Sequence, residues 1–518
     1  MPHLIARYLL FIASLYMGFY NLTFAQEPSC ASDSRITEQF DNGAVWDLCW
    51  ESTARENLVL SDVYYTPPNG TALRVLSSAR LSQLHVAYDD SDVTYNDVTQ
   101  YGLGRGYLLT LKEQDCPQGE LINIQTRPAL CKWRGDAQSG HHSANQAAKT
   151  HSLHLFSVSQ VGAYAYITNW TFHANGAIEP SVGATGALQR SSDDTSEPYG
   201  RELSGDQDTL WLSHTHNYYW RLDFDIGESA TDDIFSQTRY EVTPAGTRAQ
   251  RVDRFVTEQA LKINPDEQAN WTIHANARAD SPAFSIEPIR SGHRFERQEV
   301  EPYSDYDFFV TVANDCERFA SQNARFNPDC LNDVLQFVDG QSIVEEDLVV
   351  WNRVSFHHVP RNEDQRHMHT HWDGFLIRPR NVLSRTASLN DAPNSVPTLA
   401  PMETRYTKLG ELVHENVEAN DADGDFLLYT ATGLPSGVTI NSLGHLHGEP
   451  DVEGRYTVTI TAMDDQHEAA RTFFWTINQT GAAERRKSGR VDVSLLTLVL
   501  ASLIWTRRSN KCPARQSL

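Results

Sequence analysis

Four residues in three separate segments have the types and spacing of a redox-active metal site. His214 and His216 form an H-x-H pair in an extended segment, and because side chains alternate along a strand, both imidazoles point to one face. With His358 they make three imidazoles that leave a coordination position open, which is typical of catalytic transition-metal sites. Tyr164 lies in an aromatic segment with strand-like alternation and is the candidate redox partner. Neutral imidazoles suit copper(II), and coordination geometry must decide between copper and zinc.

The segments that must position these side chains have the pattern of short strands. Runs rich in Val, Thr and Tyr alternate with turns rich in Gly, Pro, Asn and Asp, and aromatic residues make up 10% of the chain. This pattern predicts a mainly β fold. A length of 518 residues predicts roughly two to four domains.

The chain is strongly acidic. It carries 43 Lys and Arg against 67 Asp and Glu, which gives a net charge of −24. Such a balance argues against nucleic acid as a partner. It is compatible with a cationic substrate drawn by the field of the protein, and equally with an acidic surface that keeps an exported protein soluble.

The motifs around Tyr164 and the histidines resemble those of the copper amine oxidases, whose active-site tyrosine is oxidised to topaquinone by the enzyme's own copper. The family pattern T-x-G-N-Y-[DE]-Y, W-x-F-x-x-x-G-x-I and G-A-T-G is matched by V-G-A-Y-A-Y, W-T-F-H-A-N-G-A-I and G-A-T-G within residues 161–186. The copper pair recurs in H-T-H-N-Y-Y-W-R-L-D, which begins at His214. The family's H-[hydrophobic]-P-R-x-E-D pattern places the third copper ligand at His358 rather than at His357.

The resemblance covers residues 36–385 and implies a large β-sandwich that forms homodimers. It implies an oxidoreductase that deaminates a small primary amine with oxygen and releases aldehyde, ammonia and hydrogen peroxide. Asp97 matches the family's base, which takes the α-proton from the Schiff base between amine and topaquinone. Tyr88 matches the tyrosine that hydrogen-bonds the quinone oxygen. A surface carboxylate is the alternative interpretation of Asp97, and monoamine, diamine and peptidyl lysine all stay open as substrates.

The resemblance also implies a second cation site, often occupied by calcium. Its ligands would be the carboxylates of Asp223 and Asp347 and the carbonyl oxygen of Phe224. Hard oxygen donors of this kind suit calcium.

Two residues beside Tyr164 depart from the family pattern. Ala163 stands where the family has Asn, and Ala165 stands where it has an acidic residue. In relatives these side chains help to hold the quinone ring away from copper, so we expect looser control here. Because oxidation of the tyrosine requires mainly copper, oxygen and Tyr164 itself, we expect a quinone that forms but turns over poorly. The alternative is an unmodified Tyr164 in a catalytically silent copper-binding surface protein that binds a partner through its β-modules.

A histidine run distinguishes this chain from the family. His367, His369 and His371 form H-x-H-x-H, which could ligate a further transition metal on one strand face. A zinc hydrolase is disfavoured, because no general-base Glu stands at the spacing of H-E-x-x-H.

Residues 1–25 have the features of a secretory signal peptide, with an apolar core and the sequence T-F-A before Gln26. A signal anchor is the alternative, although the apolar run is short for a span of about 20 residues. We therefore expect export, to the periplasm, the cell surface or the medium. Export permits disulfides.

Six of the seven cysteines precede the C-terminal apolar segment, and Cys512 follows it. An even number fits three disulfides. The expected pairs are Cys116–Cys131, Cys316–Cys330 and Cys30–Cys49. The first pair occupies the positions of a disulfide in the family, the second flanks a polar loop, and the third is left by default.

Residues 397–478 predict a second, small β-sandwich after a linker at 386–396. The sequence T-G-L-P-S-G-V-T-I within it resembles the immunoglobulin-like and cadherin-like modules of bacterial surface proteins. The acidic segment 421–425 could bind calcium, or it could be a solvated turn.

Residues 491–508 combine an apolar run with Arg507 and Arg508, as expected of a tail held in a membrane. The segment resembles bacterial C-terminal sorting tails, which are processed during delivery to the cell surface, but it lacks the glycine pair usual before such tails. A plain membrane anchor is the alternative.

Overall fold

The structure is a computed structural model, and it describes residues 27–90, 94–142, 147–188, 190–192, 200–204, 206–227, 229–278, 280–287, 300–382, 395–422, 427–464 and 467–483. The predicted signal peptide, the C-terminal tail, Cys512, most of the predicted linker and part of the acidic segment 421–425 lie outside these residues. The chain divides into two compact units, the first built mainly from residues up to Thr398 and the second mainly from Leu399 onward.

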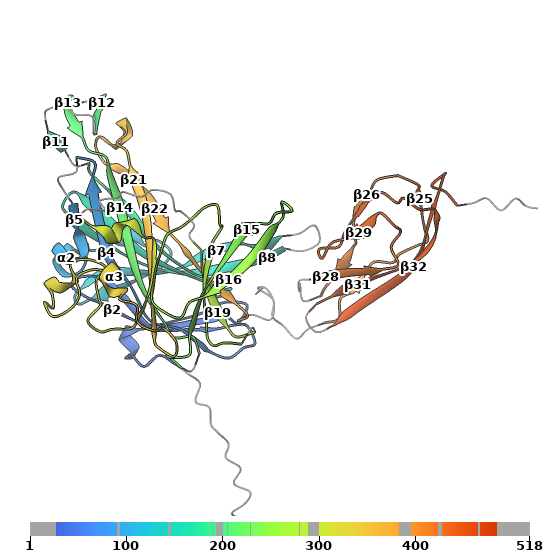
Figure 1. Cartoon of the computed structure of the whole chain (residues 1–518), viewed down its shortest axis with the longest axis horizontal. Helices are drawn as coiled ribbons and strands as arrows, with labels where there is room; N and C mark the ends of the chain where they lie inside the picture. Colours follow the sequence, from blue (N-terminus) through green and yellow to red (C-terminus); the bar gives the residue numbers. More distant parts are fainter. Residues whose placement is uncertain are drawn as a thin grey trace, which may run out of the picture. The chain divides into compact units, whose positions relative to one another are not determined.

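Two large, mostly antiparallel sheets form the first unit (Figure 1). In spatial order the first sheet contains β1 (Arg35–Gln39), β2 (Val45–Ser52), β3 (Leu58–Thr66), β4 (Leu73–Tyr88), β14 (His214–Phe224), β21 (Leu348–His358), β20 (Phe308–Val312) and β17 (Gln259–Leu261), with β5 (Thr94–Asn96) paired to β4. The second contains β16 (Arg248–Arg254), β15 (Ile234–Val242), β18 (Asn270–His274), β19 (Ala283–Glu287), β23 (Leu376–Arg380), β10 (Ile178–Gly186), β9 (Tyr164–His173), β8 (Ala147–Val161), β7 (Arg127–His142) and β6 (Glu120–Ile124), with β22 (Met368–Gly374) paired to β10. Residues of both sheets share one apolar core, so the unit is a β-sandwich.

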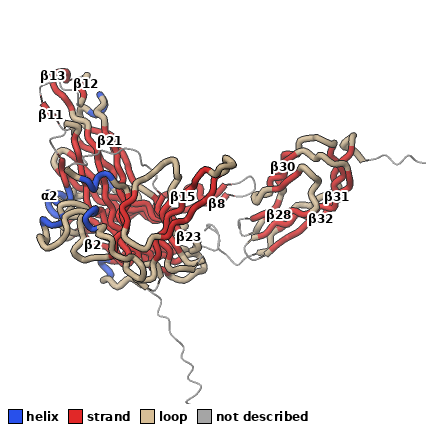
Figure 2. Tube along the Cα trace, in the orientation of Figure 1, coloured by secondary structure: helices blue, strands red, loops and turns tan. Residues whose placement is uncertain are grey.

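Smaller elements complete this unit. A three-stranded sheet contains β11 (Arg190–Ser192), β13 (Asp206–Trp211) and β12 (Arg201–Leu203). The helices are short: α2 (Asp97–Gln100), α3 (Val334–Phe337), and the 3-10 turns η1 (Ser32–Ser34), η2 (Arg105–Tyr107), η3 (Glu113–Asp115), η4 (Pro302–Asp305), η5 (Asn323–Arg325) and η6 (Asn362–Asp364). Strands dominate both units (Figure 2), which confirms the predicted mainly β fold.

Strand β14 shows how alternation in the sequence builds the sandwich. It lies between β4 and β21, and all of its residues are buried. Its even-numbered side chains face the second sheet, where Trp220 packs edge-on against Trp170 with ring centroids 5.1 Å apart. Its odd-numbered side chains face a separate apolar cluster, in which the rings of Tyr219 and Tyr303 lie 5.9 Å apart. The H-x-H pair therefore begins a strand that is covered on both faces.

Tyr164 begins β9 directly after a tight hairpin turn. Gly162 in this turn has a φ of +59°, which glycine adopts without strain. Gly186 of β10 is paired with Tyr164 and has a φ of +121°. A Cβ at Gly186 would collide with the carbonyl oxygen of Ala163, so the close approach of this turn to β10 requires glycine.

Three disulfides stabilise the first unit, and they are the three expected pairs, Cys30–Cys49, Cys116–Cys131 and Cys316–Cys330. Within the described ranges, no helix has the length and apolar character needed to cross a membrane.

Within the described part of the chain, residues 398–478 contain nine further strands in three small sheets. They are β24 (Thr398–Leu399) with β27 (Ala419–Asn420); β25 (Arg405–Lys408), β32 (Glu468–Asn478), β31 (Gly454–Met463) and β28 (Leu428–Thr432) in one sheet; and β26 (Val413–Asn416), β30 (His445–Gly448) and β29 (Val438–Ile440) in another. Trp475 is fully buried, and its indole N–H donates to the hydroxyl of Thr407 at 2.9 Å. The guanidinium of Arg405 lies 4.3 Å from the centre of the Trp475 ring.

Candidate active site and metal centre

The three predicted metal ligands lie together because of strand register. Across the first sheet, His214 of β14 pairs with His358 of β21 on one side and with Tyr88 of β4 on the other. His216 lies two residues along β14 and shares the inward face. The ring centroids of His214 and His216 are 4.7 Å apart, and those of His214 and His358 are 5.1 Å apart. His357 alternates to the opposite side and contacts Asp89 at 3.1 Å, so His358 is the histidine that joins the cluster.

All three imidazoles have at least one nitrogen with a polar partner, and two of them also have a nitrogen without one. His214 Nε2 lies 3.3 Å from the Tyr164 hydroxyl, Nδ1 of His216 lies 3.0 Å from the hydroxyl of Tyr218, and Nε2 of His358 lies 3.1 Å from Asp364. Nε2 of His216 and Nδ1 of His358 are buried without a hydrogen-bond partner, whereas His214 also has a hydrogen bond with the backbone of Leu212. A buried nitrogen of this kind is costly unless a metal or another partner occupies it.

Burial keeps these rings neutral. It lowers the pKa of His214 to about 3, with the neighbouring His358 as the second cause, and it lowers the pKa of His216 well below the usual value. Neutral imidazole is the form that binds a metal. Among the described residues, no group of three or more His, Cys, Asp and Glu side chains is already arranged to hold an ion. The free nitrogens of His216 and His358 are nevertheless donors of the type that binds copper, and the ring of His214 lies directly beside both.

Tyr164 is buried against these histidines. Its ring meets those of His214 and His216 edge-on at 5.3 and 5.6 Å between centroids, and it stacks on Tyr166 at 6.2 Å. Only 6% of Tyr164 is exposed. The predicted redox partner therefore stands directly beside the predicted metal ligands.

Asp97 is a buried carboxylate at the start of α2, so the surface-carboxylate interpretation is wrong. It is 5% exposed and accepts a hydrogen bond from the Tyr166 hydroxyl at 2.9 Å. Burial raises the pKa of Asp97 from 3.8 to about 7, while the hydrogen bond from Tyr166 opposes the rise. A pKa near neutrality suits a general base.

Tyr88 is also buried, with its ring centroid 5.1 Å from that of His214. Burial and the neighbouring Tyr164 raise the pKa of Tyr88 well above its usual value. Tyr88 therefore stays protonated and can donate a hydrogen bond.

One cavity of about 200 Å³ joins these groups. It is lined by Val86, Tyr88, Tyr95, Asp97, Tyr101, Val161, Gly162, Ala163, Tyr164 and Tyr166. Tyr101 is 40% exposed and stands at the solvent side. The site thus combines a redox-capable tyrosine, a base with a raised pKa and a neutral phenol around a space for a small molecule.

The two alanines beside Tyr164 have different positions. Ala163 lines the cavity. Ala165 alternates to the other face of β9, so its side chain points away from the Tyr164 side. The expectation that both losses loosen control of the ring is therefore corrected: only position 163 lies where a side chain could restrain Tyr164 from within the cavity.

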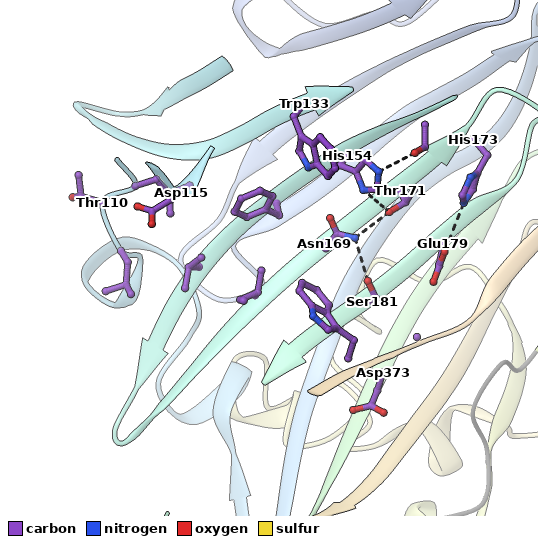
Figure 3. A pocket seen from close by; sticks show the side chains of 18 residues that line it. Thr110, Asp115, Trp133, His154, Asn169, Thr171, His173, Glu179, Ser181 and Asp373 are labelled. Carbon is purple, nitrogen blue, oxygen red and sulfur yellow. Dashed lines mark hydrogen bonds and ion pairs between the residues drawn. The ribbon is translucent and has the colours of Figure 1, made fainter. Parts of the chain in front are cut away.

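A second, larger cavity of about 710 Å³ is lined by side chains of β8, β9 and β10 (Figure 3). Asn169, Thr171 and His173 line it, and these odd-numbered side chains alternate with Tyr164 and Tyr166. Thr171 contacts the ring of His154 at 3.1 Å, and Asn169 donates to Ser181 at 3.2 Å. The larger of these two cavities is therefore not the one that contains the redox residues.

The predicted second cation site gathers acidic side chains. Phe224 pairs with Leu348, which brings Asp223 close to Asp347. Burial raises the pKa of Asp347 to about 6, and Asp223 and Asp225 add to the rise. Arg221 and Arg74 already contact Asp223 and Asp225 at 3.0 and 2.6 Å. The prediction did not include Asp225, which follows the end of β14 and also raises the pKa of Asp347.

The histidine run does not form one face. β22 contains a register shift: Gly186 pairs with Met368 but Ala184 pairs with His371, so the strand has one extra residue. His367 and His369 are exposed, whereas His371 turns inward. Its ring centroid lies 5.5 Å from that of His216 and 5.8 Å from that of His358. The predicted separate H-x-H-x-H site is therefore wrong.

The fold and these motifs define a copper amine oxidase domain followed by an immunoglobulin-like domain. The family described as "Copper amine oxidase, enzyme domain" matches residues 128–398, more than half of the chain, and the family described as "Putative Ig domain" matches residues 396–478. The chain belongs to the copper amine oxidase family.

Particular relatives come from plants and bacteria. The chain is 26% identical over 406 residues to primary amine oxidase 2 of Arabidopsis thaliana. The aligned region covers 70% of this chain and 61% of the relative. It is 24% identical over 400 residues to the primary amine oxidase of Klebsiella aerogenes. That aligned region covers 67% of this chain and 52% of the relative. The chain thus spans between about half and three fifths of the length of these two relatives.

Solved structures share the fold. A copper-containing benzylamine oxidase from Hansenula polymorpha superposes with a TM-score of 0.57 at 16% identity, over 69% of this chain and 62% of that one. The amine oxidase of Aspergillus nidulans superposes with a TM-score of 0.55 at 21% identity, over 66% and 52%. This likeness confirms the β-sandwich of the first unit.

Proposed function

We propose that this protein is a copper- and topaquinone-dependent oxidase of small primary amines, with Tyr164 as the precursor of the quinone. The observation that carries the proposal is the shared site: Tyr164 and Asp97 line one cavity, and Tyr164 packs against His214 and His216, of which His216 has a buried nitrogen without a partner. The net reaction takes amine, oxygen and water to aldehyde, ammonia and hydrogen peroxide.

His214, His216 and His358 would hold the copper. When bound, copper would promote oxidation of Tyr164 by oxygen, and the quinone would accept the two electrons of the amine. His358 is oriented by Asp364, and His216 by Tyr218. Partners of this kind fix the tautomer and direction of a metal-binding ring.

Asp97 would move the proton. With a pKa of about 7 it is partly deprotonated at neutral pH and can accept a proton from the α-carbon of an amine held in the cavity. The Tyr166 hydroxyl holds one carboxylate oxygen, which fixes the direction of the other. Tyr88 stays neutral and would donate a hydrogen bond to an oxygen on the modified ring.

The size of the cavity supports a small substrate. About 200 Å³ lies below the roughly 300–1,000 Å³ of sites that enclose drug-sized ligands. Tyr95 and Tyr101 offer aromatic surface beside Asp97, which suits the alkyl or aromatic part of a small amine.

The decisive test is labelling of the mature, aerobically copper-loaded protein with phenylhydrazine, followed by mass spectrometry of the peptide that contains Tyr164. We expect a hydrazone adduct at Tyr164 that is absent from Tyr164→Phe. An unmodified Tyr164 in protein shown to contain copper would refute the oxidase proposal.

One observation favours a second function, that of a catalytically silent copper-binding surface protein. Ala163 lines the cavity beside Tyr164 without a polar group that could orient a quinone. This alternative predicts bound copper, no adduct and no hydrogen peroxide with any primary amine.

Export, dimerisation and the second cation belong to the same proposal. Three disulfides support export to an oxidising compartment, either free or attached through residues 491–508. Family membership supports a homodimer, which light scattering of the purified protein tests. The carboxylates of Asp223 and Asp347 support a calcium site, for which the test is a calcium-dependent rise in the melting temperature that Asp347→Asn removes.

A further inference from the structure

His371 belongs to the histidine cluster although no family motif contains it. We propose that His371 is a fourth histidine of the copper centre and supplies its Nε2 as an additional ligand. This inference rests on the proposed copper site. It concerns the coordination of the ion and not the substrate.

The route by which His371 reaches the centre is a β-bulge. β22 pairs with β10, and β10 pairs in turn with β9, which carries Tyr164. Between the pairs Gly186–Met368 and Ala184–His371, β22 has one more residue than β10. The extra residue shifts the alternation, so His369 stays exposed and His371 turns to the inner side.

The imidazole of His371 has the same arrangement of partners as His358. Its Nδ1 contacts the carboxylate of Asp373 at 2.9 Å, as Nε2 of His358 contacts Asp364 at 3.1 Å. Its Nε2 is buried and has no hydrogen-bond partner. A carboxylate on one nitrogen and an uncommitted second nitrogen are typical of a metal-binding histidine.

Neighbouring rings fix where this nitrogen can go. Phe356 stacks on His371 with centroids 4.1 Å apart and an interplanar angle of 29°. The other neighbours are His216 at 5.5 Å and His358 at 5.8 Å between centroids. The Phe356 ring has no donor atom, so the nitrogen-bearing rings closest to His371 are those of the two predicted copper ligands.

The ring separations permit a shared ion. A ligating nitrogen lies about 2.0 Å from the metal, and the ring centre lies about 1.2 Å behind it, so two rings on one ion are separated by no more than about 6.4 Å. The distances from His371 to His216 and His358 fall within this limit, as does the 5.1 Å between His214 and His358. An additional imidazole suits copper(II), which binds imidazole and favours square-planar or tetragonal sets of nitrogen and oxygen donors.

The test uses the full-length mature protein loaded with one equivalent of copper(II). Electron paramagnetic resonance is compared between the wild type, His371→Ala and His369→Ala, and copper affinity is measured by competition with a chelator. His369 is the matched control, because it lies on the same strand but is exposed. We expect His371→Ala to change the copper hyperfine pattern and to weaken binding by about 10- to 100-fold or more, the range that loss of even an outer-shell partner produces. We expect His369→Ala to match the wild type.

Two further measurements test the role of His371 even if His371→Ala fails to fold. Pulsed resonance of the wild type counts coupled histidine nitrogens: four supports the inference, and three overturns it without any variant. Asp373→Asn keeps the imidazole but weakens its orientation, so a spectrum between those of the wild type and His371→Ala is expected.

The outcomes also separate this inference from the proposed function. Wild-type protein that binds copper through three histidines, with His371→Ala indistinguishable from it, refutes the role of His371 and leaves the oxidase proposal intact. Wild-type protein that binds no copper refutes both.

Discussion

Replacement of Tyr166 by Phe tests how far the Tyr166 hydroxyl lowers the pKa of Asp97, the proposed base. The Tyr166 hydroxyl donates to Asp97 at 2.9 Å in a fully buried setting, and it lowers a pKa that burial raises to about 7. A hydrogen bond to a charged group contributes about 1.5–3 kcal/mol. Since one pKa unit corresponds to about 1.4 kcal/mol, Tyr166→Phe is expected to raise the pKa of Asp97 by roughly one to two units.

The consequence for catalysis follows from the fraction of Asp97 that is deprotonated. At pH 7 this fraction falls from about one half to between roughly one tenth and one hundredth, so kcat/KM at pH 7 is expected to fall roughly 5- to 50-fold. The loss should be recovered as the pH rises above about 9, because the carboxylate then forms again. The assay is hydrogen peroxide release as a function of pH with a small primary amine.

The control is Tyr101→Phe, which removes a hydroxyl from the same cavity at its solvent side. Its pH profile is expected to match that of the wild type. A Tyr166→Phe profile that is lower at every pH but not displaced would refute the reasoning, because the hydroxyl would then act on position and not on proton affinity.

Three further predictions concern stability. The pKa of Asp97 is above its ordinary value, so the folded protein binds more protons than the unfolded chain between about pH 4 and pH 7, and stability falls across that range. Asp97→Asn should therefore abolish turnover yet raise the melting temperature of the copper-free protein at pH 8, with no gain below pH 4. Trp170→Ala removes a fully buried ring that packs against Trp220 and should cost about 3–5 kcal/mol in urea unfolding. Reduction should lower the melting temperature, because each disulfide contributes about 2–4 kcal/mol; an unchanged transition under full reduction would contradict this.

The parts of the site that follow strand alternation could be predicted from the sequence. His214 and His216 share a face because they are two residues apart on β14, and the family pattern selected His358 over its neighbour. The mainly β fold followed from the same alternation, and the large β-sandwich from the family resemblance. These features are local, and each depends on one segment and its period.

Other features of the site could not be predicted from the sequence. They depend on contacts between distant segments or on an interruption of the two-residue alternation of a strand. The hydrogen bond from Tyr166 to Asp97 joins residues 69 positions apart, and only the fold shows that this carboxylate is buried. A single bulge in β22 moved His371 away from the face of His369. No sequence pattern marks that bulge, since it is set by pairing with β10 near Gly186.

The departures from the family pattern change how Tyr164 is restrained. Ala163 provides only a methyl group on the cavity side, and Ala165 faces the opposite side of β9. The contacts that remain around the ring come from Tyr166, from the histidines and from Tyr88, whose side chain hydrogen-bonds that of Tyr164. His371 adds an imidazole to that same histidine cluster. Restraint of the tyrosine therefore comes from the neighbouring tyrosines and histidines and not from a polar side chain at position 163.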